Sequence, residues 1–480
     1  MRHYGKFYIG GQWVEPAQPT VAHLINPATE TTFATVALGT AEDVDRAVQA
    51  ARQAFPAFSR TSPAERVAMI ERIIEVYESR EAELMAGVTL ELGAPCGLRD
   101  HTRGSLGLLR DAVKLLKEYP FETRMGNATI RREPIGVCGL IAAWNYPVQM
   151  VMLKLASALA AGCTVVVKPS EFTPVSAIRL AEILHDAGVP PGVFNLVIGD
   201  GPTVGNAICR HPGVAMVSFT GSTRSGILVA EAAAATVKRV CQELGGKSAN
   251  VVLPDADLRA AARWNVQRSF FNSGQSCHSP SRMLVHEGQK DAMVALLREE
   301  ATRARIGDPQ DPATTLGPVV NGLQYERIQR LIQSGIDEGA QIVCGGPGRP
   351  HGMDRGYFVQ PTIFSDVTPE MTIARQEIFG PVLSVLTYAT DEEAIAIANG
   401  TDYGLGGYVF SGDSARGRNV CEQLQVGRVF FNGDPGDMVA PMGGYKQSGN
   451  GRELGAFGLE EYLEVKAMFG LAWPGATSRR

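Results

Sequence analysis

Short hydrophobic runs alternate with longer amphipathic stretches along most of the chain. Apolar residues recur at helical spacing in two clear stretches, which predicts helices over 41–55 and 64–93. Short apolar runs bounded by turn residues predict buried strands at 136–144, 164–170, 194–200, 214–221 and 248–254. Strands separated by helices are typical of βαβ units, so the sequence predicts an α/β fold with a parallel sheet of the nucleotide-binding type.

Two segments depart from this alternation of strands and helices. Residues 126–133 and 460–470 alternate polar and apolar positions, which predicts strands that bury only one face. We expect residues 126–133 to lie outside the central sheet and the tail at 460–470 to pair with an exposed sheet edge, and both segments are candidate oligomer contacts. A second α/β block is predicted from about residue 250 to about residue 450.

Composition narrows the class of protein. The chain has 480 residues, of which 45% are hydrophobic and 20% charged, so it can bury the cores of two or more domains. The formal charge is -5 and no basic run occurs, which argues against nucleic acid as a partner. The N-terminal residues lack the apolar core of a signal peptide, and no apolar window reaches the roughly 18 residues of a membrane span. We expect a cytoplasmic protein without a membrane partner.

One of the eight cysteines is a candidate for a reactive thiol. They show no CxxC or Cys/His spacing, so neither a disulfide framework nor a metal site is predicted. Cys277 lies among Gly, Ser and Gln in "NSGQSCHSP", whereas Cys163 and Cys241 lie beside apolar residues. A thiol in a small, polar setting is the more accessible one, although a buried, inert thiol is the ordinary alternative. Adjacent side chains usually diverge, which disfavours a dyad of Cys277 with His278.

Three further segments contain candidate binding groups. The fingerprint GxGxxG is absent, and "GDGPTVG" (199–205) is its nearest approach. "SFTGSTRSG" (218–226) predicts a helix N-terminus that attracts pyrophosphate or is simply capped by Ser or Thr. Lys168 and Glu171 follow a predicted strand, where they would meet a ribose or form an ion pair.

Glu243 precedes a double glycine in "QELGGKSAN". A carboxylate in such a bend serves as a general base only if it reaches a water or a thiol, and a solvated surface carboxylate is its usual state. The sequence leaves both interpretations open.

Taken together, the motifs resemble the NAD(P)-dependent aldehyde dehydrogenase superfamily over nearly the whole chain. The ordered set is "AWNYP" (143–147), "KPSE" (168–171), "FTGST" (219–223), "ELGGKSAN" (243–250), "GQSC" (274–277), "EIFGPV" (377–382) and "PMGGYKQSG" (441–449). The resemblance implies two Rossmann-like parallel-sheet domains and a small β oligomerisation element. These are an NAD-binding domain (1–117 and 138–246), a catalytic domain (247–448) and an oligomerisation element (118–137 and 458–472) that would join a homodimer or homotetramer.

The resemblance also implies the catalytic residues. Cys277 would attack an aldehyde to form a thiohemiacetal, which loses a hydride to NAD and becomes a thioester. Asn145 and the backbone N–H of Cys277 would stabilise the oxyanion. Glu243 would activate the water that releases the carboxylic acid, and Lys154 would lie near the nicotinamide ribose.

The cofactor implied is NAD, with NADP as the alternative, because Glu171 should repel a 2′-phosphate while Lys168 offsets part of that repulsion. No metal is expected. The residues expected at the cofactor are Ile141, Trp144, Lys168, Glu171, Gly201, Gly205, Gly221, Ser222, Gly226, Leu244, Glu377 and Phe379. Those expected around the aldehyde are Tyr146, Met150, Leu153, Ser276, His278 and Met442.

Two other activities remain as alternatives. A CoA-acylating relative would pass the acyl group to CoA, and Glu243 argues against it because such relatives usually lack this base. A non-catalytic descendant of the fold would be expected to lose Cys277, Glu243 or Asn145, and all three are present. His278, Met442 and the loop "NGDPGDMVA" (432–440) depart from the commonest family pattern and leave the aldehyde undetermined.

Overall fold

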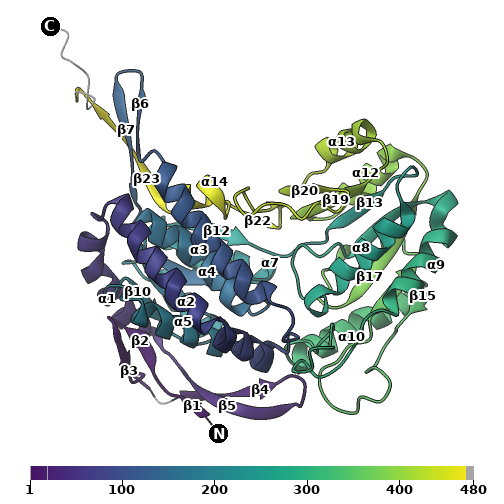
Figure 1. Cartoon of the computed structure of the whole chain (residues 1–480), viewed down its shortest axis with the longest axis horizontal. Helices are drawn as coiled ribbons and strands as arrows, with labels where there is room; N and C mark the ends of the chain where they lie inside the picture. Colours follow the sequence, from purple (N-terminus) through teal and green to yellow (C-terminus); the bar gives the residue numbers. More distant parts are fainter. Residues whose placement is uncertain (1, 19, 472–480) are drawn as a thin grey trace.

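Two mostly parallel sheets covered by helices form the two lobes of Figure 1, a computed structural model that describes residues 2–18 and 20–471. The first sheet contains, in spatial order, β22 (Gly449–Asn450), β12 (Arg239–Glu243), β11 (Met216–Thr220), β8 (Val137–Ile141), β9 (Thr164–Lys168), β10 (Phe194–Leu196), β2 (Phe7–Ile9) and β3 (Gln12–Val14). The five strands from β12 to β10 are parallel, as the alternation of strands and helices predicts.

Helices pack in layers on this sheet. The helix α1 (Ala41–Phe58) contacts β8, β9 and β10, α4 (Pro147–Ala161) contacts β8 and β9, and α5 (Val175–Asp186) contacts α4. The long helix α2 (Pro63–Leu92) packs with α3 (Asp100–Glu118) on α4. Its start is encoded locally, because Ser62 and Glu65 form a capping box around Pro63. It ends at Gly93, whose φ of 80° favours glycine.

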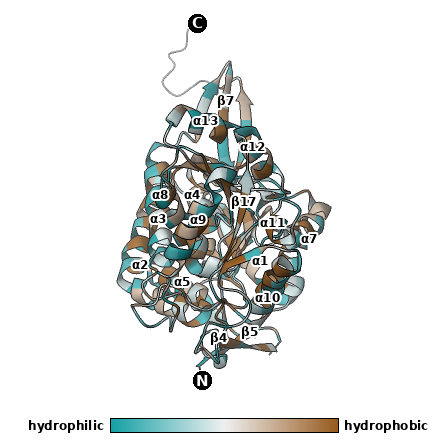
Figure 2. Cartoon of the chain, turned by 90° about the vertical axis from the view of Figure 1, so that its right-hand side faces the viewer, coloured by the Kyte–Doolittle hydropathy of each residue, from teal (hydrophilic) through white to brown (hydrophobic). Residues whose placement is uncertain are grey.

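The second sheet belongs to the later half of the chain. Its spatial order is β15 (Gln341–Cys344), β16 (Thr362–Ser365), β17 (Val382–Tyr388), β14 (Arg282–His286), β13 (Ala249–Val252), β19 (Gly406–Phe410) and β20 (Arg428–Phe431). All strands but β15 are parallel. The flanking helices are α8 (Leu258–Phe270), α9 (Lys290–Ala301), α10 (Gly322–Asp337), α12 (Asp391–Asn399) and α13 (Ser414–Gln423). Figure 2 shows hydrophobic strands inside and hydrophilic positions on the outer helices. The two mostly parallel sheets with their flanking helices confirm the α/β prediction.

The two alternating segments pair with each other. The strands β6 (Glu122–Met125), β7 (Ala128–Pro134) and β23 (Leu463–Phe469) form a three-stranded sheet that projects from the first lobe (Figure 1). The tail therefore pairs with a sheet edge, as predicted, and that edge is β7 of the same chain. Val465 and Phe469 remain exposed on β23. Position 472, the end of the predicted oligomerisation element, lies outside the described residues.

Near the N-terminus, β1 (Arg2–Tyr4), β5 (Thr31–Leu38) and β4 (Thr20–Asn26) form a further sheet that the sequence analysis did not predict. In residues 2–18 and 20–471, no helix is long and apolar enough to cross a membrane.

The strand order creates a switch point in the first sheet. From β8, the chain adds β9 and β10 on one side, and β11 and β12 then follow on the other side. In open α/β sheets, the crevice outside the carboxyl ends of the strands at such a point is where ligands bind. The segments after β8 and β11 therefore mark the place to look for a site.

Candidate active site

The loop that carries Cys277 begins with a left-handed turn. Asn272, Ser273 and Gly274 have φ values of 52°, 56° and 74°, and two of the three are not glycine. Such conformations are costly for residues with a Cβ and persist only where surrounding contacts impose them. The side-chain amide of Asn272 supplies such contacts, because its Nδ2 donates to the carbonyl oxygens of Asn145 (2.8 Å) and Gln275 (3.3 Å).

Gln275 anchors the same loop on the other side. Its Nε2 donates to the carbonyl oxygen of Asn272 at 3.1 Å, and its Oε1 accepts from the backbone N–H of Val320 at 2.9 Å. Both Asn272 and Gln275 are buried. Neither residue was among the predicted site residues, although Gln275 is part of the "GQSC" motif.

Asn145 lies between β8 and α4 and points at this loop. Its Nδ2 donates to the carbonyl oxygen of Gln275 at 3.1 Å, and its side chain is buried. A side-chain amide nitrogen carries two N–H groups, and within the described chain this one has a single acceptor. One N–H thus positions the amide, and the second is available to a substrate oxygen near Cys277.

Cys277 is half-buried, whereas Cys163 and Cys241 are fully buried, as predicted. Burial, together with the carboxylates of Glu377 and Glu243, raises the pKa of the Cys277 thiol to about 12. At neutral pH the group is therefore a thiol. Since the thiolate is the nucleophilic form, attack on a substrate requires a base that takes the proton.

The side chains of Cys277 and His278 converge, contrary to the expectation for adjacent residues. The Nδ1 atom of His278 lies 3.9 Å from Cys277 Sγ and 3.5 Å from Ser276 Oγ. The hydroxyl of Tyr408 donates to the carbonyl oxygen of His278 at 2.6 Å, which holds the backbone at this position.

Glu243 is the last residue of β12 and is buried rather than solvated. Its Oε1 has no hydrogen-bond partner among the described residues. Burial raises the pKa of this carboxyl well above its usual range, and the nearby Glu453 raises it further. A buried, unpartnered carboxylate can accept a proton from a water that reaches it.

Lys154 and Glu453 form a buried ion pair close to Glu243. The backbone of Glu453 also pairs with that of Met442, at 2.8 Å and 2.7 Å, so the ion pair is tied to an expected substrate residue. The predicted position of Lys154 beside a ribose remains a prediction. Glu453 was missed, because nothing in the local sequence "GREL" distinguishes it from a surface acid.

The expected adenosine and phosphate residues lie at the carboxyl ends of the first sheet. Lys168 Nζ lies 3.3 Å from the Glu171 carboxylate, so the ion pair that the sequence allowed is present. Gly205 lies beside the stem of Lys168, because an added Cβ there would stand 3.8 Å from the lysine Cδ. Ser222 caps α7 (Thr223–Ala233) by accepting from the Ser225 N–H at 3.2 Å.

Other members of the set contact one another. A Cβ added to Gly226 would meet the Leu244 side chain at 2.6 Å, and Ile141 ends β8 as a buried residue. Gly221 donates its backbone N–H to the carbonyl oxygen of Glu243 at 3.1 Å. Gly201 stands apart, since an added Cβ there would meet nothing within 4 Å.

The second sheet contributes Glu377 and Phe379, which precede β17. The backbone N–H of Gly246 donates to Glu377 Oε1 at 2.9 Å, and burial raises the pKa of this carboxyl. Phe379 has a φ of 59°, and its ring meets the Trp144 ring edge-on at 5.2 Å. Arg327 of α10, which the sequence analysis missed, donates to the Glu377 carbonyl oxygen at 2.6 Å. The two lobes therefore meet at the expected cofactor residues.

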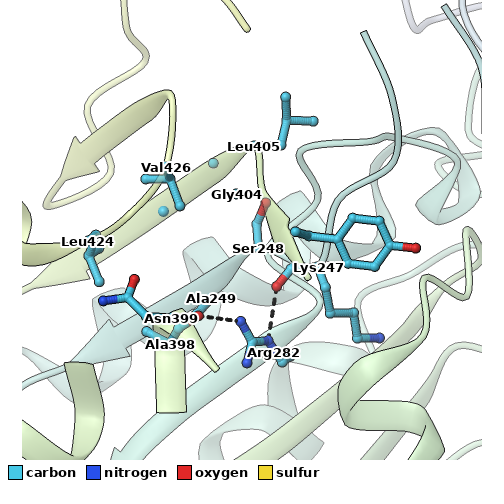
Figure 3. A pocket seen from close by; sticks show the side chains of 13 residues that line it. Lys247, Ser248, Ala249, Arg282, Ala398, Asn399, Gly404, Leu405, Leu424 and Val426 are labelled. Carbon is cyan, nitrogen blue, oxygen red and sulfur yellow. Dashed lines mark hydrogen bonds between the residues drawn. The ribbon is translucent and has the colours of Figure 1, made fainter. Parts of the chain in front are cut away.

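Lys247 is a second residue to which the sequence analysis assigned no role. Its ammonium is buried without a hydrogen-bond partner in the described part of the chain, and burial together with Arg282 lowers its pKa to about 7. Figure 3 shows it beside a small pocket, with its side chain directed away from the guanidinium of Arg282. Arg282 donates to the carbonyl oxygens of Lys247 (2.9 Å) and Ala398 (2.7 Å), which ties the "GGKS" bend to the second sheet.

The expected substrate residues come from α4, the Cys277 loop and the chain before β22. Tyr146 is buried and stacks on His101 with ring centres 4.7 Å apart. Met150 and Leu153 are buried on α4, and Ser276 is buried next to the nucleophile. Over residues 2–18 and 20–471, no group of three or more His, Cys, Asp or Glu side chains is arranged to hold a metal ion.

Comparison with known proteins identifies the family of the chain. Residues 13–468 match the model of the aldehyde dehydrogenase family. A 3-succinoylsemialdehyde-pyridine dehydrogenase from a Pseudomonas species is 52% identical, over 98% of this chain and 99% of its own. A mutant aldehyde dehydrogenase C from Pseudomonas syringae, solved with NAD+ and octanal, superposes with a TM-score of 0.96 at 50% identity and covers 98% of both chains.

A Mycobacterium tuberculosis aldehyde dehydrogenase solved with NAD+ is 39% identical with a TM-score of 0.95, over 99% of this chain and 100% of its own. The match of the family model and the high identity span nearly the full length of the chain. The chain belongs to the aldehyde dehydrogenase family.

Proposed function

We propose that the protein oxidises an aldehyde to its carboxylic acid with NAD+, through a thioester on Cys277. The observation that carries the proposal is the hydrogen bond from the Asn145 amide to the carbonyl of Gln275, two residues before Cys277. It supports Asn145 as a donor to an oxyanion formed at the half-buried thiol, and a donor with a thiol is the pair of groups that acyl chemistry on cysteine requires.

The residues at the switch point fit a dinucleotide. Lys168 and Glu171 offer polar groups at the end of β9, while Gly205 and Gly226 leave room where a Cβ would meet Lys168 and Leu244. Glu377 presents a carboxylate from the other lobe, suited to ribose hydroxyls. Bound there, NAD+ supplies a hydride acceptor. Two of the similar structures were solved with NAD+, which supports NAD over NADP as the cofactor.

The reaction would then proceed in two halves on this chain's side chains. Cys277 Sγ bonds to the aldehyde carbon, and the Asn145 amide donates to the oxygen that becomes an oxyanion. After oxidation to the thioester, Glu243 takes a proton from water as the water attacks the acyl carbon. The C–S bond breaks, the acid leaves and the thiol is restored.

The division into an NAD-binding part, a catalytic part and an oligomerisation element belongs to this proposal. Apart from β22 and Val137 at the start of β8, the strands of the first sheet fall in the first of these ranges and those of the second sheet in the second. The exposed apolar residues of β23 support the third as a contact between subunits of a homodimer or homotetramer. A cytoplasmic location stays a prediction. One similar protein is named a 3-succinoylsemialdehyde-pyridine dehydrogenase and another was solved with octanal, so both kinds of aldehyde belong in the first substrate panel.

The test is NADH absorbance with the purified protein, NAD+ and aliphatic, aromatic and semialdehyde substrates, with the acid product identified. Cys277→Ala should abolish NADH formation, while Cys96→Ala, at another half-buried cysteine, should not. Adding CoA separates the acylating alternative, because an acyl-CoA product would replace the acid. No NADH from any aldehyde in protein that still binds NAD+ would contradict the proposal and favour a non-catalytic role.

A further inference from the structure

The left-handed turn that begins the Cys277 loop receives a hydrogen bond from an imidazole on α3. Nε2 of His101 lies 3.2 Å from Oδ1 of Asn272, across 171 residues of sequence, and both side chains are buried. The Asn272 amide nitrogen donates to the carbonyl oxygens of Asn145 and Gln275, so the amide oxygen is left to accept. The imidazole supplies the donor for that oxygen.

The tautomer of His101 follows from its surroundings. Burial lowers the pKa of the ring to about 4, so the imidazole is neutral at neutral pH and carries one hydrogen. Nδ1 has no hydrogen-bond partner among the described residues, whereas Nε2 faces an amide oxygen. We therefore assign the hydrogen to Nε2, because a hydrogen on Nδ1 would set the Nε2 lone pair against those of Oδ1.

The position of His101 is fixed by contacts outside the nucleophile loop. Its ring stacks on Tyr146, with ring centres 4.7 Å apart and ring planes 30° apart. The Ser105 hydroxyl donates to the His101 carbonyl oxygen at 3.1 Å. The buried Tyr77 of α2 donates its hydroxyl to the next carbonyl oxygen, that of Thr102, at 2.9 Å. The first turn of α3 is therefore held in place by its own neighbours.

The amide of Asn272 in turn holds the expected oxyanion donor. Its Nδ2 lies 2.8 Å from the Asn145 carbonyl oxygen and 3.3 Å from that of Gln275. The side-chain amide of Asn145 donates to the same Gln275 oxygen at 3.1 Å, so its direction depends on both carbonyl groups. A buried amide oxygen that loses its donor is destabilising. Rotation of Asn272 to relieve that loss would break its bonds to both carbonyl groups.

We propose that His101 is a positioning residue, which donates its Nε2–H to Asn272 and thereby keeps the Asn145 amide directed at the oxyanion that forms when Cys277 is acylated. His101 acts through Asn272 and neither gives nor takes a proton in the reaction. The inference rests on the proposed function, in which Asn145 stabilises an oxyanion at Cys277. It places the effect of His101 on the rate of oxyanion formation and not on the binding of NAD+.

The experiment separates the N–H group of His101 from its ring. His101→Phe keeps an aromatic ring against Tyr146 but has no N–H, whereas His101→Gln has no ring but keeps an N–H for Asn272. The full-length variants are treated with p-nitrophenyl acetate, which needs no NAD+. The acetyl group passes to Sγ of Cys277, and the thiol proton leaves with p-nitrophenol. The absorbance of p-nitrophenol gives the rate, and mass spectrometry confirms the acetylated residue.

Loss of the donor should slow acetylation more than loss of the ring. His101→Phe should react about 10-fold to 100-fold more slowly than wild type, since displacing a reacting group by about 1 Å costs about 100-fold. His101→Gln should recover most of the wild-type rate. With an aldehyde, kcat should fall in His101→Phe while KM for NAD+ stays unchanged.

Two controls distinguish positioning from general damage to the site. Alkylation of Cys277 by iodoacetamide forms no oxyanion, so its rate should be the same in wild type and in both His101 variants. His185→Phe removes an imidazole that is likewise hydrogen-bonded and packed on an aromatic ring, that of Tyr8, and should be acetylated at the wild-type rate.

A double variant tests whether His101 acts through Asn272. Asn272→Ala should by itself slow acetylation. Adding His101→Phe should slow it no further, because the donor has already lost its acceptor. If His101→Phe slows the Asn272→Ala protein as much as it slows wild type, the assigned route through Asn272 is wrong.

Three other results would overturn the proposal. Equal acetylation rates in wild type and His101→Phe would show that the donor is not needed. A slow His101→Gln beside an unaffected His101→Phe would show that the stacked ring matters instead. A parallel loss of alkylation and acetylation would show that the whole loop is displaced.

The formation of NADH from aldehydes judges the proposed function separately. If the expected pattern holds with the ester but no aldehyde is oxidised, the role of His101 stands and the proposed function fails. If aldehydes are oxidised but the pattern with the ester is absent, the proposed function stands and the role of His101 fails.

Discussion

The side-chain amide of Asn145 donates to the carbonyl oxygen of Gln275 at 3.1 Å, across 130 residues of sequence. Because Asn272 donates to Asn145 in return, the end of β8 and the Cys277 loop are held as one unit. A donor that is already in position does not need to reorganise when negative charge develops on a substrate oxygen. Preorganised donors of this kind account for much of the rate enhancement at such sites.

Asn145→Ala removes that donor. We expect kcat to fall about 100-fold to 1,000-fold, the usual loss of one oxyanion donor. Steady-state kinetics with the best aldehyde measures it, and circular dichroism checks folding. Asn419→Ala, on the surface of α13, is the control and should be silent. A kcat within threefold of wild type for Asn145→Ala would remove the residue from the mechanism.

Glu243→Gln tests the hydrolytic half. Gln keeps the size of the side chain but cannot take a proton from water, so the acyl group should form and then persist. Stopped-flow absorbance should show a burst of NADH near one equivalent per site, followed by slow turnover. Glu231→Gln, on the exposed face of α7, should show wild-type turnover. Wild-type steady-state rates in Glu243→Gln would rule out this residue as the base.

The pH dependence of hydrolysis should respond to the Lys154 and Glu453 pair. The base must be ionised, so the rate falls as the pH drops through the raised pKa of Glu243. Glu453→Gln removes a negative neighbour, which lowers that pKa and moves the acid limb to lower pH. Lys154→Met removes a positive neighbour and should move it to higher pH. Each change leaves a buried charge unpaired at a cost of ~3 to 5 kcal/mol of stability, so the profiles are measured well below the melting temperatures.

Shifts of the acid limb in the same direction for both variants would contradict this electrostatic account. In that case the change of charge would not be what shifts the pKa of Glu243, and a general loosening of the site would explain both shifts of the acid limb.

Gly246 allows the backbone after β12 to approach the nucleophile loop closely. A Cβ at this position would stand 2.2 Å from the carbonyl oxygen of Cys277, so the loop must shift in Gly246→Ala. A displacement near 1 Å at a reacting group costs about 100-fold in rate, and we expect a loss of that order in kcat. Gly107→Ala on α3, where a Cβ meets nothing within 4 Å, should be neutral. Unchanged kcat in Gly246→Ala would show that the loop adapts freely.

Glu171→Gln addresses cofactor choice. The carboxylate beside Lys168 should repel a 2′-phosphate, and its removal leaves Lys168 free to attract one. We expect kcat/KM for NADP+ to rise relative to NAD+ by about tenfold, which corresponds to roughly 1.4 kcal/mol. If the wild-type protein prefers NADP+ over NAD+, the prediction is contradicted before any variant is made.

Local patterns determined much of this protein. Apolar runs and helical periodicity predicted β8, β9, β10 and β11 of the first sheet, β13 of the second and the helices α1 and α2, because strand and helix preferences act over neighbouring residues. The alternation at 126–133 and 460–470 likewise predicted strands. Seven short motifs identified the family, which the family match confirmed.

The tertiary structure decided what those residues touch. No pattern pairs Lys154 with Glu453, 299 residues away, or joins β7 to β23 instead of to another edge. The convergence of His278 on Cys277 runs against the ordinary divergence of neighbours. It arises where the chain leaves a left-handed turn at Asn272 and Ser273 and where Tyr408 holds the backbone. Sequence patterns encode which face of an element is buried, whereas these contacts depend on how distant elements pack together.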